Sequence, residues 1–320
     1  MFFKTAGIEV AFWIPPLVAF IISFFTSMGG VSGAFLLLPF QMSFLGYINP
    51  SVSATNQLFN IVAIPSGVYR YYKEGRMVWP LAWVVIAGTL PGVFIGAIVR
   101  VSYLPDPKKF KLFAAAVLLY IGVKMIRDLM QKNASGSDKT NSEKRFQEII
   151  SNYRKKTVDA DTSNQNVLPV VTITHFNRKH LGYTFYGEQF DIGFWGIFAL
   201  SFIVGIVGGI YGIGGGAIIA PFFVTFFRLP VYTVAGAALM GTFVTSVAGV
   251  SFYQAIAPFY PNMSIAPDWI LGILFGIGGM AGMYIGARCQ KYIPARFIKW
   301  MLASIIVFTA AQYVKAFFGF

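Results

Sequence analysis

The sequence predicts an all-α integral membrane protein built from two copies of one helical unit, and three observations support this fold class. The first is composition: of the 320 residues, 56% are hydrophobic and 12% are charged, whereas about 25% are charged in a soluble domain. The second is an internal repeat. The third is a set of long runs without Asp, Glu, Lys or Arg, which cover residues 10–69, 77–99, 192–227, 229–267 and 269–287.

The uncharged runs can be divided into membrane segments by length. A span needs about 20 consecutive apolar residues, so several runs hold two segments each. In the first half, two apolar segments joined at a Gly-rich elbow precede spans near residues 52–70, 78–99 and 108–128. In the second half the segments are residues 192–209, 213–228, 232–256, 268–287 and 295–315. We therefore expect about ten membrane segments, five in each half.

A polar insert separates the two halves. Residues 131–190 carry nine Lys or Arg and six Asp or Glu, together with many Asn and Ser. We divide the chain into a first transmembrane repeat (1–130), this insert (131–190) and a second transmembrane repeat (191–320). Within the insert, residues 142–155 could form a polar helix or be disordered. The alternation at 170–174 and 183–186 predicts a β-hairpin.

The net charge of +13 suggests an anionic partner, which could be nucleic acid or the lipid headgroups of a membrane. Lys and Arg stand at the ends of apolar runs and in the insert, which favours anionic headgroups and membrane topology. We expect membrane lipid as a partner and no nucleic acid. The single cysteine, Cys289, rules out a disulfide within one chain and fits a small residue at the edge of a span.

The internal repeat rests on two sets of matching residues. Gly30-Val-Ser-Gly33 followed by Pro39 matches Gly212-Ile-Gly-Gly215 followed by Pro221 with the same internal spacing. Trp79 and the glycine ladder Gly88, Gly92 and Gly96 match Trp269 and the ladder Gly278, Gly282 and Gly286 at a constant separation of 190 residues. The ladders favour close helix packing, and a sliding surface between the halves is the alternative.

The number of segments sets the relation between the halves. With five segments per half, the second copy enters from the opposite face, so the repeat is inverted about an axis in the membrane plane. This geometry suits alternating access. If each elbow is a broken or re-entrant hairpin that reaches only the middle of the bilayer, the sidedness of every later loop stays the same.

The orientation follows from the basic residues near short loops. The face that collects Arg70, Lys73, Arg76, Arg288 and the insert is richer in Lys and Arg than the face with Lys4 and Arg100. We expect a multi-pass protein of the cell inner (plasma) membrane, with the 131–190 insert cytoplasmic and both termini outside.

The two Gly-rich elbows are the strongest local signal. Glycine costs about 1 kcal/mol per residue in a helix relative to alanine, so its concentration marks broken helix or close backbone approach. One interpretation is that the glycines serve tight helix packing. The other is that the elbows are the N-termini of half-helices, which offer free N–H groups and the positive end of the helix dipole to an anion. The candidate anion-binding residues are Gly29, Gly30, Ser32 and Gly33 in the first elbow, and Gly212, Gly214, Gly215 and Gly216 in the second.

These elbows, each followed by a proline and by a later Gly-x3-Gly-Ala span, resemble the sulfite exporter TauE/SafE family of membrane transporters. The resemblance covers roughly residues 10–128 and 192–317 and is best at Gly212 to Pro221. The first elbow departs from the pattern, with Ser32 and Ala34 where the second has Gly214 and Gly216. The resemblance implies transport of sulfite or related sulfur-containing or small organic anions. The insert lies outside it.

Polar residues inside the spans are the remaining site candidates. Asn56 and Asn60 share one helical face, and such side chains can donate hydrogen bonds to an oxyanion or link neighbouring helices. The candidates are Asn56, Gln57 and Asn60 in the first half, and Thr242, Thr245 and Ser246 in the second.

Three other functions were weighed against a transporter. Gly30-Val-Ser32-Gly33 matches a serine nucleophile pattern, but no span holds a histidine to act as base, so no enzyme is expected. A passive anion channel would share the elbows and polar lining. A membrane scaffold or sensor would act through the insert. His175 and His180 are expected to be solvated loop residues, and neither a metal nor a cofactor is expected. Homo-oligomer formation, substrate, direction and coupling ion stay open.

Overall fold

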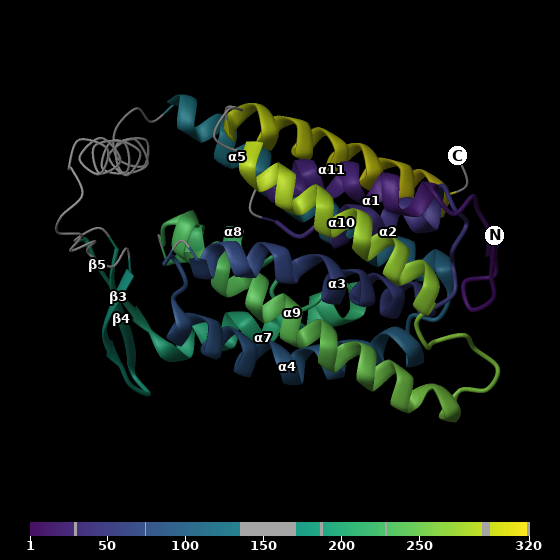
Figure 1. Ribbon diagram of the computed structural model, residues 1–320, viewed down its shortest axis with the longest axis horizontal. Coiled ribbons are helices and arrows are strands. Elements are labelled where there is room, and N and C mark those ends of the chain that lie inside the picture. Colours follow the sequence, from purple (N-terminus) through teal and green to yellow (C-terminus); the bar gives the residue numbers. More distant parts are fainter. Residues whose placement is uncertain are drawn as a thin grey trace.

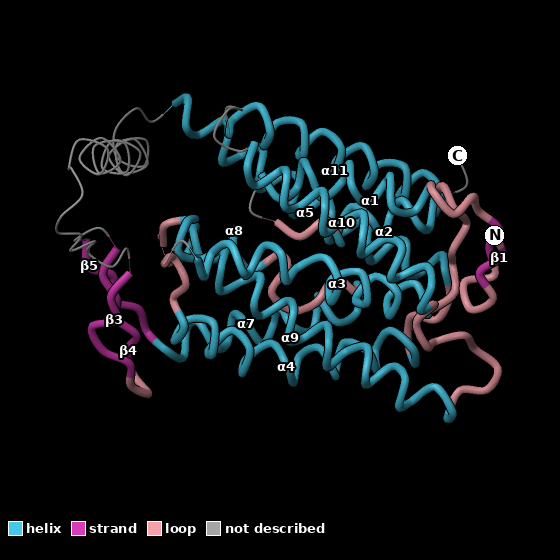
Figure 2. Tube along the Cα trace, viewed as in Figure 1, coloured by secondary structure: helices cyan, strands magenta, loops and turns pink. Residues whose placement is uncertain are grey.

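The computed structural model describes residues 1–28, 31–73, 75–134, 171–185, 188–227, 229–289 and 295–318, which are mostly helical (Figure 2). The first half contains helices α1 (Ile14–Met28), α2 (Ala34–Ser43), α3 (Ser51–Lys73), α4 (Trp79–Ser102) and α5 (Pro107–Ala134). The second half contains α7 (Phe194–Tyr211), α8 (Ile219–Phe226), α9 (Val231–Ile256), the 3-10 turn η1 (Ala257–Phe259), α10 (Trp269–Cys289) and α11 (Ala295–Phe318).

Length and hydropathy identify the helices that can cross a membrane. Four helical stretches in the described part of the chain are long and apolar enough: Trp79–Ser102, Phe194–Tyr211, Thr233–Phe259 and Trp269–Gly286. By contrast, α2 has 10 residues and α8 has 8 residues. Because a span needs about 20 residues, α2 and α8 are too short to cross alone. The helical membrane class is therefore confirmed, with two short helices that follow the elbows.

The helices form two groups that lie side by side. In Figure 1, α1, α5, α10 and α11 run along one side of the molecule, and α3, α4, α7 and α9 run along the other. The closest pairs are α4 with α7 and α1 with α10, and α3 packs against both α9 and α10. Helices from the two halves are thus interleaved instead of forming two separate bundles.

The glycine ladders make the two closest pairs. A Cβ added at Gly92 on α4 would lie 2.5 Å from the carbonyl oxygen of Phe202 on α7. A Cβ at Gly282 on α10 would overlap the carbonyl of Phe20 on α1 in the same way. The lack of a side chain therefore lets backbones touch, as small residues do at membrane helix contacts. The prediction that the ladders serve close packing is confirmed.

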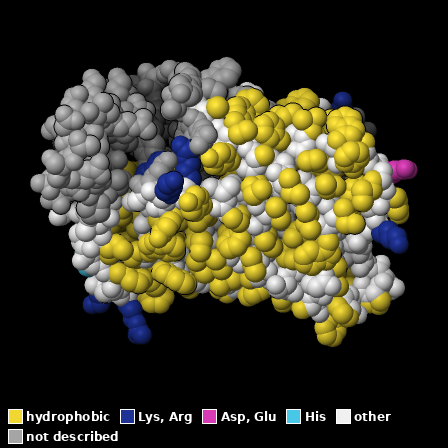
Figure 3. All heavy atoms as spheres, in the orientation of Figure 1, with side chains coloured by type: hydrophobic (Ala, Val, Ile, Leu, Met, Phe, Trp, Pro, Cys, Tyr) yellow, Lys and Arg dark blue, Asp and Glu magenta, His cyan; other side chains and the backbone are white. Residues whose placement is uncertain are grey.

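The two ends of the bundle differ. The start of the chain and the end of α11 lie at one end, and the strands after residue 170 lie at the other (Figure 1). Exposed tryptophans stand at both: Trp13 and Trp269 where α1 and α10 begin, Trp79 and Trp195 where α4 and α7 begin. In Figure 3, hydrophobic and uncharged groups cover the middle of this face, and charged side chains lie toward its ends. Aromatic residues at two levels are typical of the two membrane–water interfaces.

A three-stranded antiparallel sheet caps one end of the bundle. Its strands are β3 (Val171–Phe176), β4 (His180–Phe185) and β5 (Glu188–Gly193), in that order. The predicted hairpin is confirmed as β3 and β4. The third strand was not predicted, and it runs directly into α7. A second, two-stranded sheet joins β1 (Phe2–Phe3) to β2 (Ile8–Glu9), so the all-α prediction holds for the membrane part and not for its two ends.

The sheet is packed against the helices and not suspended from them. Leu181, Tyr183 and Phe185 on β4 are fully buried. The Tyr183 hydroxyl lies 2.9 Å from the Thr233 hydroxyl on α9, and burial raises the pKa of Tyr183 above its ordinary value. The described end of the 131–190 insert is therefore part of the folded unit. The predicted polar helix at 142–155 lies outside the described residues.

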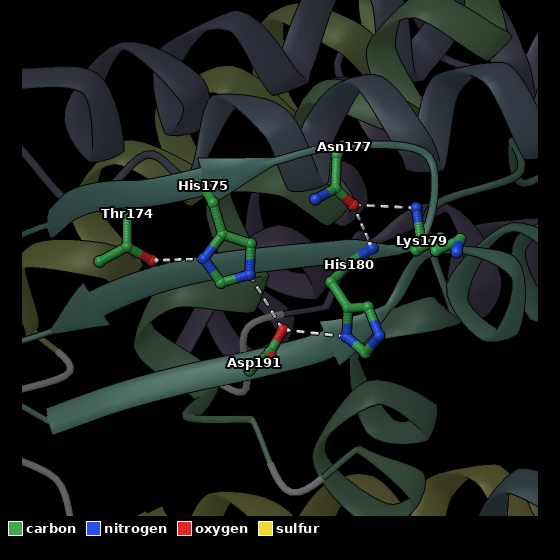
Figure 4. A network of polar contacts seen from close by, with 6 residues as sticks. All are labelled: Thr174, His175, Asn177, Lys179, His180 and Asp191. Atoms are coloured by element: carbon green, nitrogen blue, oxygen red, sulfur yellow. Dashed lines mark hydrogen bonds and ion pairs between the residues drawn. The ribbon is translucent and has the colours of Figure 1, made fainter.

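Two histidines share one carboxylate on the sheet surface. His175 Nε2 and His180 Nδ1 lie 3.2 and 3.3 Å from the same oxygen of Asp191 on β5 (Figure 4). Their placement on strands corrects the prediction that they are loop residues, although they are exposed as expected. Among the described residues no group of three or more His, Cys, Asp or Glu could hold a metal ion.

The packing of the ladders gives a stability prediction. Gly92→Ala should lower the apparent melting temperature of the detergent-solubilised protein, because the new Cβ would meet the Phe202 carbonyl at 2.5 Å. Overpacking of this kind costs about 1–3 kcal/mol. Gly193→Ala is the matched control, since nothing lies within 4 Å of a Cβ at that position. Equal melting temperatures for the two variants would contradict the close α4–α7 contact.

Candidate functional site

The second elbow and the described end of the first lie in the interior of the bundle, where Ser32 contacts α3 and Gly215 contacts α9. The second elbow begins where α7 ends at Gly212, which has a left-handed φ of 78° and whose N–H donates to the Gly208 carbonyl at 2.9 Å. Gly214 is also left-handed, with φ 79°. Only glycine adopts this conformation without strain, and glycine at such a position is a common helix end. The chain thus breaks in the middle of the bundle as predicted.

Asn60 on α3 joins the two elbows. Its side-chain oxygen accepts a hydrogen bond from the Ser32 hydroxyl of the first elbow at 2.8 Å. Its amide nitrogen donates to the Ile213 carbonyl of the second elbow at 2.8 Å and to the Ser246 hydroxyl on α9 at 3.2 Å. One buried side chain therefore connects α3, α9 and both breaks in the helices.

Asn56 makes the same kind of link one turn earlier on α3. Its amide nitrogen donates to the carbonyls of Ala34 and Gly212, each at 3.0 Å, and its oxygen accepts from the Gln41 amide at 3.2 Å. Both protons of each asparagine amide are thus engaged by elbow groups or by Ser246. In this conformation the amides of Asn56 and Asn60 spend their hydrogen bonds on protein groups. A ligand could reach these amides only by displacing an elbow.

Threonines on α9 line the other side of the second elbow. The Gly215 N–H donates to the Thr245 hydroxyl at 3.0 Å. The hydroxyls of Thr242 and Thr245 donate to carbonyls of their own helix, at 2.8 Å and 2.7 Å. A Cβ at Gly214 would lie 2.8 Å from the Ser246 hydroxyl, and one at Gly216 would overlap the Ala238 carbonyl. The three predicted α9 residues therefore contact the predicted glycines directly.

Two buried amides of the second elbow stand out. The N–H groups of Gly212, Ile213 and Gly215 all donate hydrogen bonds, whereas those of Gly214 and Gly216 find no acceptor among the described residues. Both glycines are buried. Buried backbone donors are nearly always paired with protein or water. The elbow therefore keeps two donors available just before α8, where the positive end of the helix dipole lies.

The first elbow is built differently. Gly29 and Gly30 lie outside the described residues. The Ser32 hydroxyl accepts a hydrogen bond from the Ala34 N–H at 3.3 Å. A side chain therefore pairs with the first N–H of α2. Gly33 has φ −63°, an ordinary helical value. The departure at Ser32, noted in the sequence, thus gives an elbow held by a hydroxyl where the second has a left-handed glycine.

Gln57 does not join the elbow network. The side chain is fully buried, and neither its oxygen nor its nitrogen has a hydrogen-bond partner among the described residues. It packs against Gly249 on α9, where any added Cβ would overlap its amide. Buried polar side chains are rarely left unpaired. Gln57 stays a candidate ligand contact, on a different side of α3 from Asn56 and Asn60.

Arg100 is the residue that the sequence placed wrongly. It was assigned to a loop face, yet it lies in the last turn of α4 with no exposed surface. Its Nε donates to the Ser53 hydroxyl at 3.3 Å, and Ser53 in turn lies against Gly212 of the second elbow. The spacing held the missed signal: Arg100 follows Gly96 by four residues, and so continues the glycine face that points into the bundle.

The hydrogen bonds of Asn60 to both elbows give a second prediction. Asn60→Ala should lower the free energy of unfolding by about 1–3 kcal/mol, because it leaves the buried Ile213 carbonyl without its donor. A thermal melt in detergent measures this loss. Asn49→Ala is the matched control, since the Asn49 amide makes one 3.5 Å bond to the Ala6 carbonyl and should have little effect. An equal effect of both changes would refute the role of Asn60 as the link between elbows.

Comparison with known proteins gives the family. The family model for the sulfite exporter TauE/SafE matches residues 16–313. Among curated proteins, "Probable membrane transporter protein YdhB" of Bacillus subtilis (strain 168) is 26% identical over 115 residues, which is 36% of this chain and 43% of that protein. "Probable membrane transporter protein YunE" of the same organism is 22% identical over 129 residues, 40% of this chain and 43% of that protein.

The extent of these matches differs. The aligned parts span less than half the length of both curated relatives, and no solved structure matches this chain. The family model, however, covers both helical halves, both elbows and the insert between them. The chain therefore belongs to the sulfite exporter TauE/SafE family of membrane transporters.

Proposed function

We propose that this protein is a secondary transporter that exports small anions, sulfite or related sulfur-containing and organosulfonate anions, by alternating access. One observation carries the proposal: the second elbow holds two buried N–H groups, at Gly214 and Gly216, that have no acceptor among the described residues and lie next to polar side chains of α3 and α9. Free N–H groups at the start of a helix favour a bound anion. The family name supports sulfite.

The packing supports an inverted five-segment repeat. If α1 to α5 correspond to α7 to α11, the pair α1–α10 becomes the pair α7–α4, and these are the two closest pairs. The partners of the ladders obey the same rule, since Phe20 and Phe202 stand 182 residues apart, as do the two elbows. In addition, α1 begins at the end with the termini, whereas α7 begins at the end with the sheet (Figure 1).

Alternating access would use the elbow contacts as a switch. Asn56 and Asn60 now hold the carbonyls of Ala34, Gly212 and Ile213. When the elbows move relative to α3, these amides can leave the carbonyls and turn to an oxyanion between the elbows. Transporters with broken helices place their substrates at the repeat interface in this manner. Glycine–backbone contacts between α4 and α7, and between α1 and α10, keep each helical group stiff during the movement.

The driving force follows from the charges within the spans. The described part of the membrane helices carries no carboxylate that could relay protons at mid-span. An anion leaving a cell with a negative interior gains about 2.3 kcal/mol per charge per 100 mV. Export of an anion therefore needs no coupling ion. The basic loops favour a cytoplasmic insert. The proposed location is the cell inner membrane.

The third prediction is a flux measurement. Proteoliposomes loaded with sulfite should show saturable, voltage-sensitive efflux, and Gly215→Leu should reduce it at least tenfold, because any side chain there overlaps Thr89 and displaces the elbow. Gly193→Leu is the matched control, because nothing lies within 4 Å of that position. Its flux should equal that of the wild type.

Two outcomes would contradict the proposal. Measurable single-channel current without saturation would identify a passive anion channel, since a transporter turns over slowly and never opens both gates at once. Absence of flux of sulfite, thiosulfate and sulfonates by correctly folded wild type would refute the proposed substrate class. A melting curve on each variant distinguishes lost transport from lost folding.

A further inference from the structure

We propose that Arg100, with Ser53 and Tyr253, forms a positively charged anion-binding site beside the second elbow, on the route from the elbow to the end of the bundle that carries the termini. The ligand class is a small oxyanion. This inference rests on the proposed function, because it names the step at which the transported anion leaves the elbow. Nothing in the sequence pattern of the elbows themselves requires a cation at this place.

The first support is an unpartnered, buried positive charge. Arg100 has no exposed surface, and within the described residues its guanidinium forms no ion pair. Nε donates to Ser53 and Nη1 donates to the Leu104 carbonyl, but Nη2 is buried without a hydrogen-bond partner. Burial of a charge is costly unless it is paired and fully hydrogen-bonded. An arginine that keeps one free nitrogen offers a donor and a charge to an anion.

The second support is position. Ser53 contacts both the guanidinium and the elbow, because a Cβ at Gly212 would lie 2.5 Å from the Cα and Cβ of Ser53. Tyr253 on α9 lies in one buried cluster with Ala54 on α3 and Ala97 on α4, and its hydroxyl donates to the Gly209 carbonyl at 3.5 Å. The cluster thus joins α3, α4 and α9 directly beside the residues where α7 ends.

A purely structural role for Arg100 explains less. The contact with Leu104 closes the last turn of α4, and the Phe110 ring lies 3.8 Å from the guanidinium carbon. Both contacts reduce the cost of burial, the second through cation–π attraction. A neutral glutamine could also bind the Leu104 carbonyl and Ser53, without burying a charge. The positive charge and the free Nη2 are the features that helix capping leaves unexplained.

The repeat places this charge on one side only. The residue that corresponds to Arg100 at the 190-residue separation of the ladders is Gln290. The cation is therefore a departure from the two-fold pattern that both ladders otherwise keep. An anion path with a fixed cation at one end only is asymmetric between the two faces of the membrane.

The test is binding of sulfite to the full-length protein in detergent, measured by ligand-dependent thermal shift, alongside flux in proteoliposomes. Arg100→Gln should weaken sulfite binding at least thirtyfold. Arg100→Lys keeps the charge but loses the planar fork, and should weaken it about tenfold. Lys124→Gln is the control, because it removes a cation that lies 4.0 Å from the Phe222 ring on α8, and should change the affinity less than twofold.

The outcomes separate this site from the proposed function. Wild-type affinity in folded Arg100→Gln overturns the site, and if that variant does not fold, wild-type affinity in Arg100→Lys overturns it. Failure of the wild type to bind sulfite, sulfate or methanesulfonate overturns it as well. Arg100-dependent binding without any flux would refute the transport proposal and leave the site standing. Normal flux with an unchanged KM in Arg100→Gln would refute the site and leave transport standing.

Discussion

The structure depends on one constraint: inside a bilayer, every backbone N–H and C=O must find its partner within the protein. Two elbows break this rule locally, because helices that stop in the middle of the bundle leave carbonyls and amides unpaired. Asn56 and Asn60 supply the missing donors to the carbonyls of Gly212 and Ile213, which follow the end of α7. Asn56 also donates to the Ala34 carbonyl at the start of α2. The amides of two side chains thus make a broken backbone tolerable in an apolar environment.

The placement of those side chains depends in turn on the glycine ladders. Because α4 contacts α7 and α10 contacts α1 through backbone, the elbows are held at a fixed depth between α3 and α9. Larger residues on the ladders would separate the helices and move the elbow carbonyls out of hydrogen-bond reach of the asparagines. The same ladders explain why the four helices nearest the site belong to both halves of the chain.

Much of this arrangement could be predicted from the sequence, because it follows from local pattern. Glycine spacing and charge-free length located the helices, the elbows and the α3 and α9 residues that the structure brings together. Partners in space could not be predicted. Whether an asparagine amide binds an anion or an elbow carbonyl depends on tertiary contact. The burial of Arg100 is hard to predict because a charged residue at the end of an uncharged run usually lies at the membrane surface, whereas only its place on the glycine face of α4 indicates burial.

The balance between paired and unpaired groups indicates how such a site could work. The elbow carbonyls are satisfied by asparagines that can rotate away. In the described part of the chain, the amides of Gly214 and Gly216 and the Nη2 of Arg100 have no partner to lose. An arriving oxyanion can therefore accept hydrogen bonds at once and strengthen them as the asparagines reorient. Binding then competes directly with the contacts that join the two elbows, which couples occupancy of the site to the position of the elbows relative to α3.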